Sequence, residues 1–282
     1  GIKKVDNYIK KIRQSFQKRK FMTADEIEQE KIYSEIKKQI EMDAIQAERI
    51  VMHKISDITN EQVFLVKWTS CAYDQCTEET KQTLIDHGFG KLIEEYFDRE
   101  SKIYGMKAMA SVWNRGPLSV TKFDPYHETP FYLNEKKLRA YQLTGLNWIV
   151  SRMKRNLSVL LADEMGLGKT VQTIAVVGHM LYKEKLIGPY LVIVPQSTVD
   201  NWLNEFKSWL PQANVVCYHG NAVSRELIRT HELKKVYVPN KGYRYKFDVC
   251  ITTPSILNSV SDVELLKKMP WQLMVVDEAH QL

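Results

Sequence analysis

The pattern of apolar and polar positions divides the chain into two regions. In the first, residues 49–55 and 62–68 form two short apolar runs, RIVMHKI and QVFLVKW, around the polar stretch DITNE. Such runs on either side of a polar turn are typical of a β-hairpin. Residues 83–100 follow with the spacing of an amphipathic helix. We therefore predict a small α+β domain over residues 44–100.

In the second region, from residue 138 onward, strand-like and helix-like runs alternate. The apolar runs are LSVLLA, YLVIVP, NVVCYH, FDVCITT and QLMVVD, with amphipathic stretches such as TVQTIAVVGHML and VDNWLNEFKSWL between them. Strands buried on both faces of a parallel sheet read as continuous apolar runs. The alternation predicts an α/β lobe over residues 135–282, a parallel sheet with helices on both faces.

Two connecting segments complete the organisation. Residues 1–43 are rich in Lys, Glu, Gln and Ile, which predicts a helical linker, and Thr23 is a suitable N-cap within it. Residues 101–134 contain two glycines and three prolines without sustained periodicity. We predict an irregular linker there, with the domain boundary inside it.

Composition and charge narrow the classes of protein. A formal net charge of +6 and 26% charged residues fit a soluble globular chain, but residues 1–20 hold eight bases against one acid, and residues 21–50 hold eight acids against four bases. Neither a membrane-spanning apolar run nor a secretory signal is present, so we expect an intracellular protein without a membrane partner. The cysteines form no CxxC pair, which favours reduced thiols over a zinc site. They are Cys71, Cys76, Cys217 and Cys250.

The stretch DEMGLGKT joins an apolar run to a helical one, as a phosphate-binding loop does. Gly166 and Gly168 would let backbone N–H groups face phosphates, and the helix N-terminus adds positive potential. We expect Lys169 to reach the β- and γ-phosphates of ATP and Thr170 to hold Mg²⁺. The strict pattern has glycine where this chain has Asp163, which affects the expected shape of the loop more than its role. Because GxGKT also occurs by chance, an ordinary glycine turn is the alternative.

A carboxylate pair follows the last apolar run, which continues into Asp277, Glu278, Ala279 and His280. Ligands gather at the carboxyl ends of strands in such sheets. Asp277 is expected to hold Mg²⁺ through water, and Glu278 to orient and deprotonate the attacking water. Such a pair is often only a solvated turn, but the upstream loop favours catalysis, with Lys169 as the third catalytic residue.

These motifs, with LRAYQLTGLNWI and LVIVPQSTVDNW, resemble the RecA-like ATPase lobe of SWI/SNF-class chromatin remodelers in helicase superfamily two. That family carries Asp at the position of Asp163. The resemblance implies that Gln142 reads the adenine edge, which suits an amide, although a surface glutamine is the alternative. It also implies contacts with DNA phosphates, which hydroxyls make without reading bases. The residues concerned are Ser197, Thr198, Thr252 and Thr253.

The stretch 47–79 is similar to a chromodomain, whose core contains FLVKW. Methyl-lysine readers in that family surround the cation with about three aromatic rings. On that pattern Trp68 occupies one cage position, but Ile45 and Cys71 occupy the other two. We therefore favour a structural or regulatory chromodomain over a histone reader.

A chromodomain before this type of lobe is the arrangement of chromodomain-helicase-DNA-binding (CHD) remodelers, and GIKKVDNYIKKI resembles the stretch between their paired chromodomains, most closely in subfamily one. The resemblance implies a nuclear enzyme that uses ATP and Mg²⁺ to move along double-stranded DNA on nucleosomes. It also implies an acidic helix near residues 25–48 that hinders DNA entry. Because the family's charge-stabilising arginines lie in a second lobe, we expect this fragment to bind nucleotide but scarcely hydrolyse it.

Two alternatives compete with this interpretation. The chain could act mainly as a histone-tail-binding module, with the ATPase lobe as a scaffold. It could also be a P-loop enzyme unrelated to nucleic acid, such as a small-molecule kinase, although PQSTVDNW and ITTP argue against that.

Overall fold

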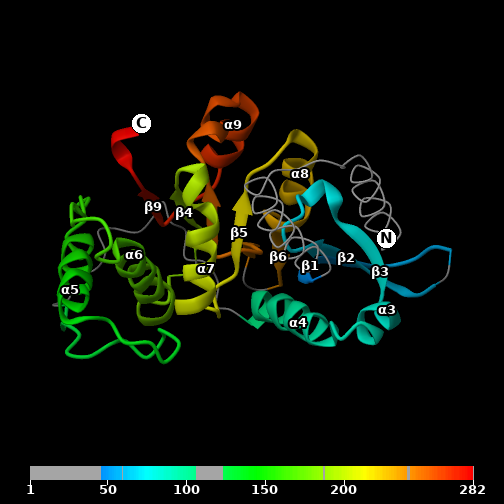
Figure 1. Ribbon diagram of the computed structural model, residues 1–282, viewed down its shortest axis with the longest axis horizontal. Helices are drawn as coiled ribbons and strands as arrows, with labels where there is room; N and C mark the ends of the chain where they lie inside the picture. The colour runs from blue at the N-terminus through cyan, green and yellow to red at the C-terminus, as the bar shows by residue number, and fades with distance from the viewer. Residues whose placement is uncertain (1–45, 59, 106–122, 187, 240–241, 282) are drawn as a thin grey trace, which may run out of the picture. The chain divides into compact units, whose positions relative to one another are not determined.

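The computed structural model describes residues 46–58, 60–105, 123–186, 188–239 and 242–281. They form two compact units, coloured along the chain in Figure 1. Unit 1 runs to Lys102 and also includes Gly220–His231, and unit 2 comprises Ile103–His219 and Glu232–Leu282. The helical linker predicted over residues 1–43, with its cap at Thr23, lies outside the described residues.

Unit 1 contains a three-stranded antiparallel sheet in the order β1-β2-β3. Strands β1 (Ala47–Ile55) and β2 (Gln62–Trp68) form the predicted hairpin, and its pairing shifts register twice along β1. Strand β3 (Thr77–Thr80) was not predicted, because its sequence TEET has no apolar alternation. The core of this unit is formed by Ile50, Phe64, Val66, Trp68, Leu84, Ile93 and Tyr96.

The helical stretch after the sheet is two helices, α3 (Lys81–Asp86) and α4 (Gly90–Gly105). Thr80 caps α3, since its side-chain oxygen accepts a hydrogen bond from the Thr83 N–H at 3.1 Å. Gly88 then takes a left-handed φ of +80°, which ends the helix. The amphipathic stretch predicted over residues 83–100 is therefore interrupted at Gly88.

Unit 2 contains a four-stranded parallel sheet in the order β5-β8-β4-β9. Its strands are β4 (Tyr190–Ile193), β5 (Val215–Tyr218), β8 (Val249–Thr252) and β9 (Leu273–Val276). All four residues of β4 and of β8 are buried, as the continuous apolar runs predict. The predicted parallel sheet is confirmed.

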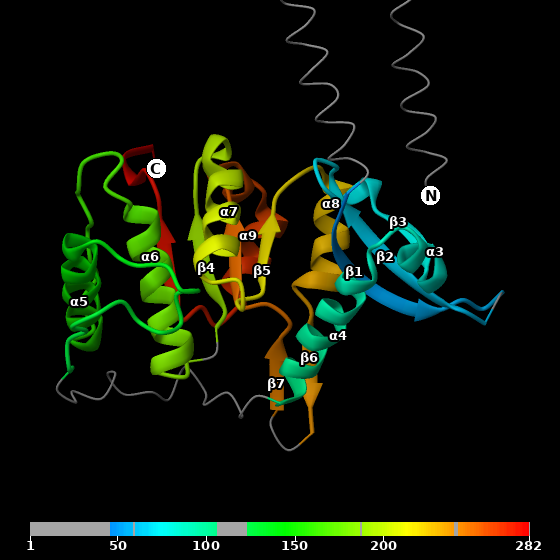
Figure 2. The same cartoon turned by 60° about the horizontal axis from the view of Figure 1, so that its bottom comes forward.

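Helices cover this sheet on both sides. They are α5 (Ala140–Lys154), α6 (Lys169–Gly178), α7 (Val199–Trp209) and α9 (Val260–Lys267). In Figure 2, α7 lies in front of the strands and α9 behind them. Helices α5 and α6 pack closely at Gly145, where an added Cβ would lie 1.9 Å from the Gln172 Oε1 atom.

Two parts of unit 2 differ from the prediction. Residues 157–162, LSVLLA, are extended but form no strand, and Leu160 is 79% exposed. A strand takes its hydrogen bonds from a neighbour, and no described strand pairs with this run. Conversely, β6 (Lys235–Val238) and β7 (Gly242–Tyr245) form an antiparallel hairpin that the sequence analysis missed.

The cysteines are reduced, as the sequence predicts. All four cysteines are free, Cys250 is fully buried, and burial raises the pKa of its thiol. Among the described residues, no helix combines the length and hydropathy that a membrane crossing requires.

Candidate nucleotide and DNA site

The glycine-rich loop leads directly into α6, as predicted. Gly166 and Gly168 have φ angles of +82° and +78°, in the left-handed region that side chains with a Cβ disfavour. Gly168 is the N-cap of α6, and its carbonyl accepts the first helical hydrogen bond, from the Gln172 N–H. A left-handed glycine turn at a helix N-terminus is a backbone arrangement that suits the binding of an anion.

Lys169, the first residue of α6, lies across the start of the loop. Its Nζ donates hydrogen bonds to the carbonyl oxygens of Asp163 (2.7 Å) and Glu164 (3.0 Å). The ammonium is solvent-accessible and, among the described residues, it donates to neutral carbonyls, which phosphate oxygens can replace. Thr170 follows in the first helical turn and is partly buried.

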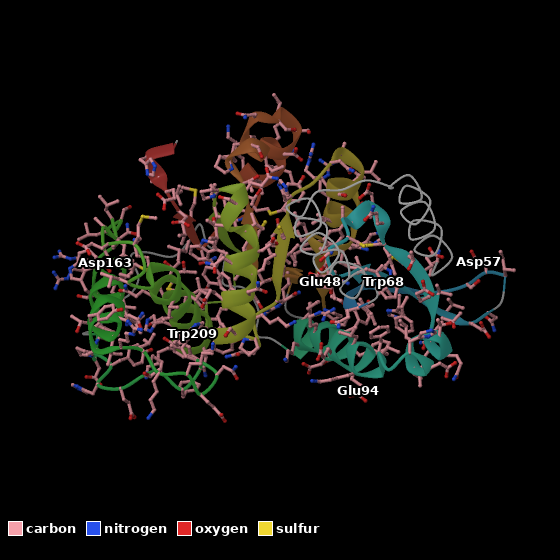
Figure 3. The ribbon with its side chains drawn as sticks, in the orientation of Figure 1. Glu48, Asp57, Trp68, Glu94, Asp163 and Trp209 are labelled. Atoms are coloured by element: carbon pink, nitrogen blue, oxygen red, sulfur yellow. The ribbon has the colours of Figure 1, made fainter. Side chains whose placement is uncertain are left out.

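Asp163, the departure from the strict motif, fastens the loop to the helix. Its Oδ2 atom accepts a hydrogen bond from the Gln172 Nε2 atom at 3.0 Å, and Gln172 is only 1% exposed on α6. In Figure 3, Asp163 lies beside helices α5 and α6. The role of Gln172 was not predicted from the sequence, because a glutamine on a helix gives no signal of a partner in a loop.

Gln142, on helix α5, also contacts this loop. It is 7% exposed, its Oε1 atom accepts from the Arg139 N–H (2.9 Å), and its Nε2 atom donates to the Leu167 carbonyl (3.2 Å). A Cβ added at Gly168 would come within 2.4 Å of that Nε2 atom. The structure therefore brings Gln142 to the phosphate loop, where it braces the backbone; contact with adenine stays a prediction.

The carboxylate pair follows β9. The Asp277 N–H donates to the Ile193 carbonyl of β4 at 2.8 Å, and the Asp277 Oδ2 atom accepts from the Trp202 Nε1 atom of α7 at 2.9 Å. Glu278 has a φ of +48°, and such outliers cluster at functional sites. Its Oε2 atom lies 3.3 Å from the His280 Nδ1 atom.

Trp202 is a core residue with 3% of its surface exposed, and Trp209 is partly buried. The hydrogen bond from Trp202 to Asp277 was not predicted. An indole N–H has only a donor role, so in this position it fixes one carboxylate oxygen. The other oxygen, Oδ1, accepts the neighbouring Glu278 N–H at 3.1 Å.

The two predicted DNA-contact segments differ in exposure. Ser197 in the short helix η4 (Gln196–Thr198) is exposed, and the Thr198 hydroxyl donates to the Pro195 carbonyl at 3.0 Å. Thr252 and Thr253 are 0% and 1% exposed. The first pair presents a hydroxyl to solvent, whereas the second supports the sheet.

The contacts of the buried pair confirm that supporting role in this structure. The Thr252 Oγ1 atom donates to the Tyr218 carbonyl of β5 at 2.9 Å. The Thr253 Oγ1 atom lies 3.3 Å from the His219 Nδ1 atom and 2.8 Å from the Ser255 Oγ atom. Contact of either threonine with DNA stays a prediction.

In the chromodomain-like unit, the one predicted cage aromatic is buried. Trp68 is 5% exposed, its Nε1 atom donates to the Thr77 Oγ1 atom at 2.9 Å, and its ring meets Phe89 edge-on at 6.0 Å. Figure 3 shows it inside this unit. Cys71 is partly buried, and Ile45 lies outside the described residues. Trp68 therefore packs in the core and does not form an exposed wall of a methyl-lysine cage.

Comparison with known proteins identifies both regions. Residues 141–282 match the SNF2-related domain family, and residues 45–99 match the Chromo (CHRromatin Organisation MOdifier) domain. The chain belongs to the SNF2-related domain family and carries a chromodomain before that domain. The predicted resemblance to chromodomain-helicase-DNA-binding remodelers is confirmed by relatives that match the whole chain.

Those relatives are much longer than this chain. It is 37% identical to Protein CHROMATIN REMODELING 5 of Arabidopsis thaliana and 34% identical to Chromodomain-helicase-DNA-binding protein 1 of Homo sapiens, with 100% of this chain and 16% of each relative covered. A solved structure, the Sulfolobus solfataricus SWI2/SNF2 ATPase core in complex with dsDNA, shares 29% identity at a TM-score of 0.41, over 56% of this chain and 28% of that one.

Proposed function

We propose that this chain is the ATP-binding lobe and regulatory chromodomain of a nuclear, ATP-dependent chromatin remodeler, whose ATP hydrolysis depends on double-stranded DNA. One observation carries the proposal: the left-handed Gly166 and Gly168 place Lys169 at the N-terminus of α6, in a chain of the SNF2-related domain family. This backbone has the features of a phosphate site.

The residues present fit Mg²⁺-ATP. Magnesium prefers oxygen ligands and binds through few protein groups, which suits the Thr170 hydroxyl and the Asp277 carboxylate. Within the part of the chain that the structure describes, no ion pair joins Lys169 to Asp277 or Glu278. The cation and the carboxylates are therefore not neutralised by each other, which supports a ligand that carries both phosphate and metal.

Each residue then has a distinct task. Lys169 would bind phosphate charge, and Asp277, whose Oδ2 atom is held by Trp202, would help to hold Mg²⁺, which would neutralise charge at the phosphates. Glu278 would accept a proton from the attacking water as the water oxygen bonds to the γ-phosphorus and the bond from that phosphorus to ADP breaks, because a carboxylate can act as a general base. Gln142 keeps the loop in its binding shape and is proposed to contact adenine.

The DNA contacts are proposed at the ends of strands β4 and β8. Ser197, which is exposed, and Thr198 are the candidates for direct contact with a phosphate, while Thr252 and Thr253 hold the neighbouring strand end. Contacts of this kind position the backbone and do not read bases. They suit movement along nucleosomal DNA of any sequence.

For the chromodomain, we propose a regulatory role rather than capture of a histone tail. A methyl-lysine cage needs open aromatic faces, whereas Trp68 is 5% exposed and bonded to Thr77. The histone-binding alternative has no described aromatic wall to support it.

Titration of a fluorescent ATP analogue with Mg²⁺ into this chain tests the nucleotide site. Saturable binding that survives Glu278→Gln is expected, because that variant keeps the phosphate contacts and removes only the base. In the full-length protein the same variant should abolish DNA-stimulated hydrolysis and nucleosome sliding. Absence of nucleotide binding, or hydrolysis by the Glu278→Gln protein at the wild-type rate, would contradict the proposal.

A further inference from the structure

A short segment of the SNF2-related domain belongs to the same compact unit as the chromodomain. Residues Gly220–His231 lie inside the span matched by the SNF2-related family, yet they cluster with unit 1. They contain α8 (Ala222–Leu227) and most of the π-helix η5 (Ile228–Glu232). The segment begins two residues after β5, at Gly220.

The chromodomain meets the N-terminus of α8 through Asp74, in the turn η1 (Tyr73–Gln75). The Asp74 carboxylate accepts hydrogen bonds from the Asn221 Nδ2 atom and the Ser224 Oγ atom, both at 3.0 Å. The Ser224 Oγ atom accepts in turn from the Asp74 backbone N–H at 3.1 Å. The serine hydroxyl thus donates to and accepts from the same residue.

Asn221 takes part in both the helix and the contact. Its Oδ1 atom caps α8 by accepting from the Ser224 N–H at 2.8 Å, which leaves its Nδ2 group to donate to Asp74. Ser224 and Ile228 are 1% and 0% exposed and lie four residues apart, on one face of the helix. The hydrogen bond from Asn221 is the main cause that lowers the pKa of Asp74.

We propose that Asp74 is a positioning residue through which this chromodomain recognises helix α8 of its own SNF2-related domain. The partner of turn η1 is then a segment of the same chain rather than a histone tail. This inference goes beyond nucleotide hydrolysis and does not depend on it.

The contact has a consequence for the proposed DNA site. Gly220, with a φ of +116°, separates the cap residue Asn221 from His219, whose Nδ1 atom lies 3.3 Å from the Thr253 Oγ1 atom. The chromodomain therefore holds a helix whose cap residue, Asn221, is separated by a single residue from His219, a partner of Thr253. This consequence, unlike the contact itself, rests on the proposed function.

A swap of the two polar groups tests the contact. Asn221→Asp keeps a good N-cap for α8 but sets a second carboxylate against Asp74, whereas the double variant Asp74→Asn, Asn221→Asp restores a donor and an acceptor with their places exchanged. Asp57→Ala, at the exposed tip of the β1–β2 hairpin (Figure 3), is the matched control for loss of an acid from the chromodomain.

The measurement is hydrogen exchange of the whole chain, read on peptides that cover residues 220–231, with β4 as an internal reference. Asn221→Asp should exchange about tenfold faster than wild type in this segment alone, and the double variant and Asp57→Ala should stay within about threefold of wild type. Binding of the fluorescent ATP analogue should be unchanged in all of them, which separates this test from that of the nucleotide site.

Two results would overturn the proposal. One is wild-type exchange in Asn221→Asp, which would mean that Asn221 acts only as a helix cap. The other is a double variant that exchanges as fast as Asn221→Asp, which would mean that the two side chains do not act on each other.

Discussion

Two tryptophans, one in each unit, are almost equally buried and use their indole N–H groups differently. Trp68 in the chromodomain is 5% exposed and donates to the Thr77 hydroxyl, which donates in turn to the Glu79 carboxylate of the same strand. Trp202 in the ATPase lobe is 3% exposed and donates to Asp277, the proposed metal ligand. Burial alone thus does not tell a scaffold residue from one that serves a site; the acceptor of its hydrogen bond does.

The largest effect is expected from Trp68→Ala. Removing a buried indole should lower the free energy of unfolding of the chromodomain by about 3–5 kcal/mol, because it leaves a cavity and removes the hydrogen bond that the Thr77 hydroxyl accepts. Chemical denaturation followed by hydrogen exchange in β1 and β2 would measure it. If this variant unfolded no more easily than wild type, while wild type bound methylated histone peptides tightly, Trp68 would be a binding residue.

Lys169→Ala should lower ligand affinity without lowering stability, which is the opposite of the effect expected for Trp68→Ala. The affinity for Mg²⁺-ATP should fall at least about a hundredfold, because phosphate charge loses its main partner, while stability stays unchanged since the ammonium is exposed. Calorimetric titration checks this, with Lys207→Ala on the exposed side of α7 as the control. Equal affinity in the Lys169→Ala protein would place the nucleotide elsewhere.

A third buried ring makes the ATPase lobe sensitive to acid. Burial lowers the pKa of His179 to about 4, opposed by Glu184, whose Oε1 atom lies 3.1 Å from the Nε2 atom. The unfolded chain binds this proton near pH 6.5, so stability is full above that pH and falls toward pH 4, by about 1.4 kcal/mol per unit. Denaturation at pH 7 and pH 5 should show this loss, and His179→Asn should reduce it; an identical loss in that variant would assign the effect to other groups.

The smallest effect is expected from replacing each tryptophan with phenylalanine. Trp202→Phe should weaken Mg²⁺-ATP binding about threefold to tenfold, because Asp277 loses the donor that orients it, whereas Trp68→Phe should leave that affinity unchanged. Paired titrations of the two variants would measure the difference. Equal affinities would show that the Trp202 hydrogen bond serves packing alone.

The sequence predicted the parts of the molecule that depend on local pattern. Continuous apolar runs located β4 and β8, and glycine spacing located the turn before α6, because burial on two faces and a left-handed backbone each restrict residue type. The partners of side chains were not predictable. Gln172 and Trp202 meet Asp163 and Asp277 only through the packing of α6 and α7.

Dependence on partners distant in the sequence also explains the two places where strands were predicted wrongly. The run LSVLLA has the composition of a buried strand, but a strand also requires a neighbour to bond with, which local sequence does not supply. Strand β3 shows the converse, since TEET pairs with β2 despite its polar composition. Pairing across the chain decided both cases.

The hydrogen bond between Asp163 and Gln172 has a consequence for the entropy of ligand binding. A glycine-rich loop that is free in solution must lose conformational freedom when it closes on a ligand, and that loss weakens the affinity. Here the first residue of the loop is already fastened to α6 at 3.0 Å. Part of the ordering has therefore taken place during folding, so the aspartate that departs from the strict motif preorganises the loop for its ligand.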